Sequence, residues 1–73
     1  MYHVRGVKFC TPKGTVNGIF EYKNKNTNSC SYNIEWRMLK KFSGYMNPGD
    51  IVSSRDYNLY VYDISKRFPE YAL

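Results

Sequence analysis

Residues 31–42, SYNIEWRMLKKF, constrain the fold of this chain more than any other stretch, because two different periods can be assigned to them. With a period of two, apolar and polar side chains alternate over residues 32–38, as they do in a half-buried strand. The alternation stops at Leu39 and at the pair Lys40-Lys41. A step of about 100° per residue keeps the apolar positions on one broad arc to the end of the stretch, so we predict a helix here.

The predicted helix separates its side chains into two faces. Its apolar arc contains Tyr32, Ile34, Trp36, Met38, Leu39 and Phe42. Glu35 is the one misplaced residue, because a carboxylate on an apolar face needs a partner. Arg37, Lys40 and Lys41 fall within an arc of about 100° on the other side. We therefore predict that these three cations form one exposed stripe.

Extended segments are predicted on both sides of the helix, because β-branched and aromatic residues are frequent there. They are residues 2–9, 16–23, 51–54 and 57–64, separated by a TPKG turn at 11–14, a polar loop at 23–29 and an NPGD turn at 47–50. Gly6 is expected to form a β-bulge, and Asp50 to bond the local backbone. The order ββαββ predicts a single α+β domain over residues 1–73, with one helix packed on an antiparallel sheet.

An alternative fold follows if residues 31–42 form a strand. The segment PGDIV at 48–52 resembles the turn and strand start found in many SH3-like barrels. This resemblance covers five residues, and it implies an all-β barrel of five short strands.

The length of the chain limits its core. A domain of this size buries only about 60% of the surface that its unfolded chain exposes. The 73 residues include eight Tyr, four Phe and one Trp, and these large rings partly offset the shortage. Pairing with a second copy is an ordinary remedy for a small core, so a homodimer is one expected state.

The net charge of +5 favours an anionic partner, either nucleic acid or an acidic protein surface. No apolar run reaches the roughly 20 residues of a membrane span, and the N-terminal residues lack the apolar core of a signal peptide. We therefore expect a cytoplasmic protein that does not insert into membranes. Cys10 and Cys30 are then expected to be reduced.

The candidates for enzyme chemistry are few, so we expect a protein without catalytic activity. His3 is the only histidine, and it falls on the opposite face from Cys10 in an unbroken strand. Two cysteines and one histidine are too few for a structural zinc site, and no cofactor or metal is expected. A small metal-free ribonuclease is a lesser alternative, because such enzymes need only positioned cations and a Tyr or His.

Two binding functions remain. Basic residues interleaved with aromatic ones suit RNA or single-stranded DNA, where cations follow phosphates and rings stack on bases. The candidate contact residues are Arg37, Lys40 and Lys41, with Arg5, Lys8, Lys23, Lys25, Lys66 and Arg67 as further cations. The alternative is a small inhibitor or adaptor that docks on an acidic surface of a host protein, of the kind that phages and viruses encode. The bias toward Lys, Asn and Tyr would suit an AT-rich genome such as many phages carry.

Overall fold

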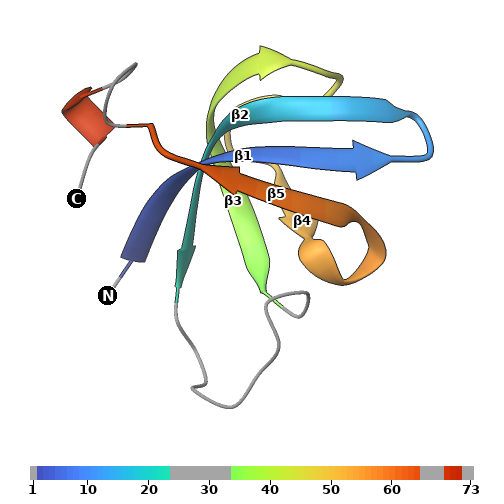
Figure 1. Cartoon of the computed structure of the whole chain (residues 1–73), viewed down its shortest axis with the longest axis horizontal. Helices are drawn as coiled ribbons and strands as arrows, with labels where there is room; N and C mark the ends of the chain where they lie inside the picture. The colour runs from blue at the N-terminus through green and yellow to red at the C-terminus, as the bar shows by residue number, and fades with distance from the viewer. Residues whose placement is uncertain (1, 24–33, 65–68, 72–73) are drawn as a thin grey trace.

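A computed structural model describes residues 2–23, 34–64 and 69–71, and it shows an all-β fold (Figure 1). The strands are β1 (Tyr2–Thr11), β2 (Gly14–Lys23), β3 (Glu35–Ser43), β4 (Ile51–Ser53) and β5 (Asn58–Tyr62). Two turns of 3-10 helix, η2 (Ser54–Asp56) and η3 (Pro69–Tyr71), complete the described elements. All paired strands are antiparallel, and the sheet order is β4-β3-β2-β1-β5.

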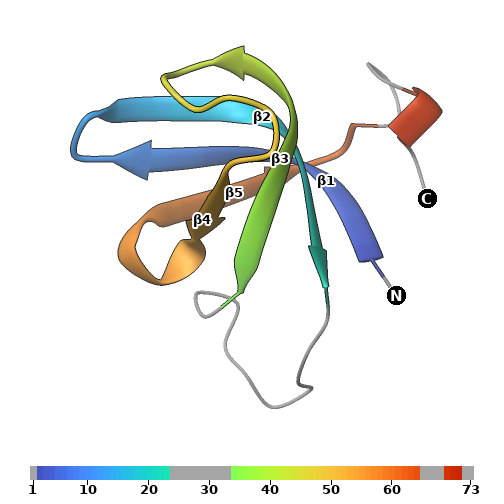
Figure 2. The same ribbon diagram turned by 180° about the vertical axis from the view of Figure 1, so that it is seen from behind.

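The sheet is curled into a half-barrel. In Figures 1 and 2, β2 and β3 bend strongly, and β4 and β5 cross in projection, one in front of the other. The prediction of an α+β fold with order ββαββ is therefore wrong. The five-stranded alternative, of the SH3-like kind, matches the described residues, and residues 35–42 of the predicted helix lie in strand β3.

Two extra residues in β3 explain why its sequence resembles a helix. Phe20 of β2 pairs with Met38, but the next residue, Ile19, pairs with Lys40, so Leu39 has no partner on β2. A second register shift leaves Phe42 unpaired in the same way. Each bulge inserts one residue and reverses the alternation of faces, which places apolar residues at intervals of three and four. The failure of the two-residue period at Leu39 is thus the signature of a bulge.

Short polar turns join the strands where the sequence predicts them. The β1–β2 hairpin closes at Pro12 and Lys13, and the hydroxyl of Thr11 donates to the carbonyl oxygen of Gly14 at 2.7 Å. In the NPGD turn, the backbone N–H of Asn47 donates to the Asp50 carboxylate at 2.9 Å. The predicted hairpin and the structural role of Asp50 are confirmed.

The main core lies on the concave face of the half-barrel. Its buried members are Val7, Phe9, Val16, Phe20, Trp36, Met38, Met46 and Val52. The Phe9 ring meets the rings of Phe20 and Trp36 edge-on, at centroid distances of 5.1 and 6.2 Å. Such edge-to-face contacts contribute about 0.5–1.5 kcal/mol each beyond the burial of area. Phe9 therefore joins the two halves of the curled sheet.

A smaller apolar layer covers part of the convex face. Ile19 and Ile64 are buried there, and the Tyr62 ring and Ile64 lie directly over Gly6. The β1–β2 register runs through Gly6 without a shift, so the predicted bulge at this glycine is wrong. Gly6 instead leaves room for side chains from the end of β5.

Gly18 gives a test of how closely β2 and β3 approach each other. A Cβ atom at this position would meet the backbone carbonyl oxygen of Lys40, whereas the nearest atoms to one at Gly6 belong to the side chains of Tyr62 and Ile64. Overpacking typically costs about 1–3 kcal/mol. We expect Gly18→Ala to reach the upper end of this range and Gly6→Ala to cost less, because side chains can move more easily than a strand. Urea unfolding followed by circular dichroism measures both, and equal stability of Gly18→Ala and the wild type would contradict the close approach.

Candidate functional site

The three cations predicted to form a stripe all lie on β3 and are all exposed. Arg37 pairs with Glu21 and Lys40 with Ile19, so these two basic residues share the convex face of the sheet. Lys41 pairs with Gly18, whose side of β2 is the concave one. The predicted helical stripe is therefore wrong in its geometry: only Arg37 and Lys40 lie on one face. That these cations contact a partner stays a prediction.

Arg37 is held in place by an ion pair. Its Nη2 donates to Oε1 of Glu21, and the side chains are 53% and 15% exposed, respectively. A solvent-exposed ion pair contributes little to the free energy of folding, about 0–1 kcal/mol. Its effect is mainly geometric, because it orients the guanidinium along the convex face.

Lys41 is directed to a different part of the molecule. Its Nζ donates to Oδ1 of Asn47 at 3.2 Å, in the turn between β3 and β4. The two lysines are adjacent in the sequence but lie on different surfaces. Lys40 and Lys41 are therefore a matched pair for mutagenesis, because the same charge reversal alters the convex face at Lys40 and the concave face at Lys41.

An apolar residue completes the surface around Arg37. Ile51 of β4 is directly opposite Arg37 in the β3–β4 register and is 62% exposed, more than the other large exposed hydrophobic residues described. We call Arg37, Lys40 and Ile51 the β3–β4 patch. Sequence reasoning missed Ile51, because its place in the PGDIV segment indicates a strand but not which face is covered.

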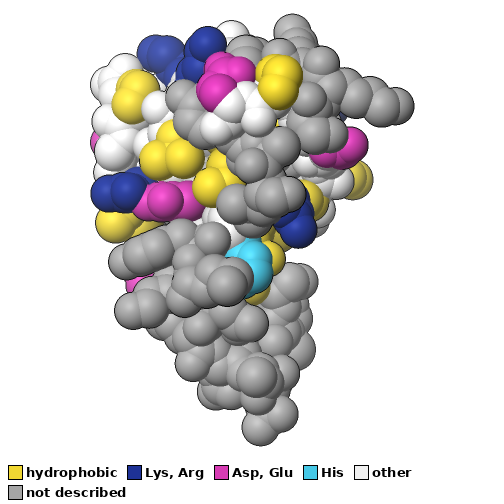
Figure 3. Space-filling model, turned by 90° about the vertical axis from the view of Figure 1, so that its left-hand side faces the viewer, with side chains coloured by type: hydrophobic (Ala, Val, Ile, Leu, Met, Phe, Trp, Pro, Cys, Tyr) yellow, Lys and Arg dark blue, Asp and Glu magenta, His cyan; other side chains and the backbone are white. Residues whose placement is uncertain are grey.

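The remaining predicted cations do not gather at this patch. Arg5 is half-buried on the concave side, and its Nη1 donates to the Val4 carbonyl oxygen at 3.0 Å. Lys8 is exposed on the convex face of β1, opposite Tyr60 of β5. The side chain of Lys23 and the whole of Lys25, Lys66 and Arg67 lie outside the described residues. Figure 3 shows hydrophobic, basic and acidic side chains intermingled on one side of the molecule, not a continuous basic field.

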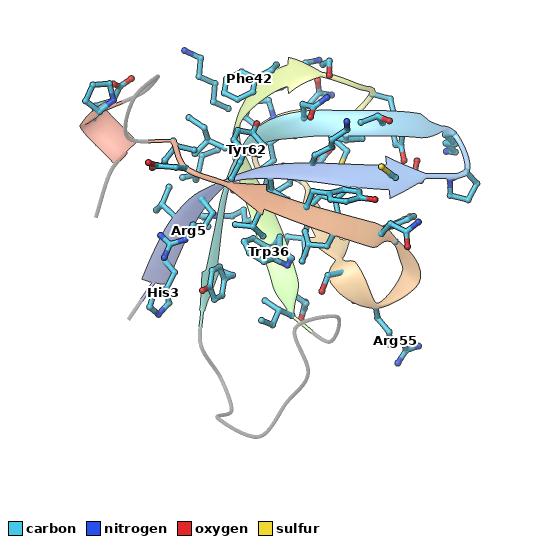
Figure 4. All side chains as sticks on the ribbon, viewed as in Figure 1. His3, Arg5, Trp36, Phe42, Arg55 and Tyr62 are labelled. Carbon is cyan, nitrogen blue, oxygen red and sulfur yellow. The ribbon has the colours of Figure 1, made fainter. Side chains whose placement is uncertain are left out.

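An aromatic series crosses the sheet from β1 through β2 to β3, and Figure 4 labels its two ends, His3 and Trp36. His3 stacks on Tyr22 at a centroid distance of 4.9 Å, and Tyr22 lies 4.3 Å from Trp36. Trp36 itself is 2% exposed, so its ring is enclosed by protein. The largest ring in the chain is therefore part of the core and cannot stack on a nucleic-acid base in this conformation.

The described residues bring together neither the pair His3 and Cys10 nor a metal-binding group. His3 and Cys10 lie on opposite faces of an uninterrupted β1, and Cys10 is a free thiol. Cys30 lies outside the described residues. Within residues 2–23, 34–64 and 69–71, His, Cys, Asp and Glu form no group of three that could hold a metal ion. Glu35 is exposed, so its predicted conflict with an apolar face does not arise.

No helix in the described part of the chain is long and apolar enough to cross a membrane.

Comparison with known proteins gives no relative for this chain. No protein-family model matches it, and neither a curated protein nor a solved structure shows significant similarity.

The indole of Trp36 provides a test of the core. Its Nε1 is buried, and none of the described residues accepts a hydrogen bond from it. Trp→Ala changes in cores cost about 3–5 kcal/mol. We expect Trp36→Phe to cost less than half as much as Trp36→Ala, because phenylalanine keeps a ring against Phe9 and removes the unpaired donor. Equal losses of unfolding free energy in the two variants would contradict the packing of the Trp36 ring against Phe9.

Proposed function

We propose that this chain is a non-enzymatic binding module that docks on an acidic surface of a partner protein through the β3–β4 patch. One observation carries the proposal: the exposed Ile51 lies directly opposite Arg37, and Lys40 shares the same face. An apolar centre with basic residues beside it is typical of a protein–protein contact. This favours the adaptor or inhibitor hypothesis over RNA or single-stranded DNA.

The character of the patch supports a protein partner. Nucleic acid binding without sequence preference depends on cations along the backbone and on aromatic rings that stack on bases. The aliphatic side chain of Ile51 serves neither purpose, and Trp36 is buried. A partner protein, in contrast, can cover Ile51 with apolar side chains and place carboxylates beside Arg37 and Lys40.

The ion pair with Glu21 prepares Arg37 for such a partner. A guanidinium has five N–H donors, so an interaction with one carboxylate oxygen leaves others available. Because Glu21 already restrains the side chain, less conformational entropy is lost when a partner binds. Arg37 can therefore bridge Glu21 and a carboxylate of the partner.

Charge reversal at the two adjacent lysines tests the face that is used. The partner is first isolated from nuclease-treated lysate at low salt, because salt screens the contact between cations and carboxylates, and is then identified by mass spectrometry and purified. We expect Lys40→Glu to weaken binding to this protein by about tenfold or more, which corresponds to about 1.4 kcal/mol, because it places like charges together. Lys41→Glu is the matched control, since Lys41 faces the turn at Asn47. Binding of both variants is measured by calorimetry.

Ile51→Ser separates the two binding hypotheses. It should weaken binding to the protein partner and leave binding to a single-stranded oligonucleotide unchanged. If captured proteins disappear after nuclease treatment, and the wild type shifts the oligonucleotide, the chain is a nucleic-acid-binding module and the proposal fails. Equal effects of Lys40→Glu and Lys41→Glu would show that the β3–β4 patch is not the contact surface.

A further inference from the structure

The two end strands of the sheet differ in how well they resist pairing with another chain. An end strand presents unpaired N–H and C=O groups, and proteins shield such edges with short strands, charges or proline. β4 has three residues and is followed at once by the 3-10 turn η2. β5 has five residues, and among the described residues it pairs with β1 alone.

The composition of β5 includes none of the residues that usually protect an edge. Its sequence, NLYVY, has no charge, no proline and no glycine. Tyr60 is 57% exposed and Val61 is 49% exposed, and their side chains lie on opposite faces of the sheet. Uncharged β-formers on a strand at the end of a sheet favour the addition of a further strand.

We propose that two copies of this chain form a dimer by antiparallel pairing of β5 with β5, about a two-fold axis at Tyr60. The axis must be perpendicular to the sheet for the two strands to run antiparallel with the same faces on the same side. Of the registers that meet this condition, the one centred on Tyr60 pairs the whole of β5 (Asn58–Tyr62).

This register matches apolar residues on both faces. On the concave face, Val61 of each copy lies opposite Leu59 of the other, and Leu59 already packs against the main core. The dimer therefore extends the core of each half-barrel across the axis. On the convex face the two Tyr60 rings meet, and an aromatic cross-strand pair contributes about 0.2–1 kcal/mol.

The charge distribution gives the dimer a distinctive dependence on salt. Each copy carries a net charge of +5, and Lys8 lies one strand away from the axis, opposite Tyr60. The strands that meet are themselves uncharged, so salt screens the long-range repulsion without weakening the contact. The screening length falls from about 10 Å at 0.1 M salt to about 3 Å at 1 M. Dimerisation should thus strengthen with salt, whereas docking on an acidic partner should weaken.

Analytical ultracentrifugation of the purified chain, over a range of concentrations at low and high salt, tests the dimer. We expect the mass of the wild type to rise from 8.6 kDa toward twice that value, at lower concentration when salt is high. Tyr60→Lys and Val61→Lys should each weaken dimerisation about tenfold or more, because each dimer carries the change twice. Ile51→Lys is the matched control: it adds the same charge at a more exposed apolar residue on the other end strand, and it should leave the dimer intact.

Two additional measurements check that the variants are folded and that β5 is the dimer interface. Circular dichroism confirms that each variant is folded, and Val61→Thr, which keeps a β-branched residue, replaces Val61→Lys if the lysine unfolds the domain. Hydrogen exchange should show protection of β5 amides that increases with protein concentration.

A wild type that remains monomeric at every salt concentration overturns the proposal. So does a dimer that Ile51→Lys dissociates and Val61→Lys does not, because that would place the interface at β4. If the chain is monomeric alone and Val61→Lys abolishes binding of the purified partner protein, the edge accepts a strand from that partner, and the homodimer is wrong. The function proposed for the β3–β4 patch is judged separately, since it depends on Lys40 and Ile51.

Discussion

The curvature of β3 is the constraint on which the rest of the structure depends. Leu39 and Phe42 are additional residues with respect to β2, and each increases the bend and twist of the strand. The bent strand passes so close to β2 that only a glycine fits at position 18. The bent strand contributes Trp36 and Met38 to the same core as Phe9, whose ring meets Trp36 edge-on, so that a single curled sheet can enclose a core. A flat sheet of these strands would leave the same residues in water.

The bulges also determine the surface. Because the extra residue at Leu39 reverses the alternation, Arg37 and Lys40 lie on one face although they are three positions apart. Lys41, the next residue, belongs to the other face and bonds Asn47. The pairing of β3 with β4 then places Ile51 beside Arg37. The β3–β4 patch is therefore a product of the same register shifts that curve the sheet.

The two ends of the sheet have different chemistry. At the β4 end, a short strand and nearby cations suit a side-chain contact with an acidic protein. At the β5 end, the strand has five uncharged residues, of which Tyr60 and Val61 expose large side chains. Binding at one end does not occupy the other. A dimer joined through β5 would present two copies of the β3–β4 patch, and two linked sites bind a multivalent partner more tightly than one.

The sequence by itself determined most of the local structure, because turns and strands depend on neighbouring residues. Pro12 and Gly14 indicated the hairpin, NPGD indicated the turn, and NLYVY indicated a strand. It also predicted that the three cations of β3 are exposed, since charged side chains are costly to bury.

Only the tertiary structure decided between strand and helix at Leu39, because a bulged strand and a helix produce similar apolar spacings. The choice depends on pairing with Phe20 and Ile19, which are distant in sequence. The same contacts decided which cations share a face and that Ile51 lies beside Arg37. The pairing register of two strands depends on both segments, so neither segment determines it alone.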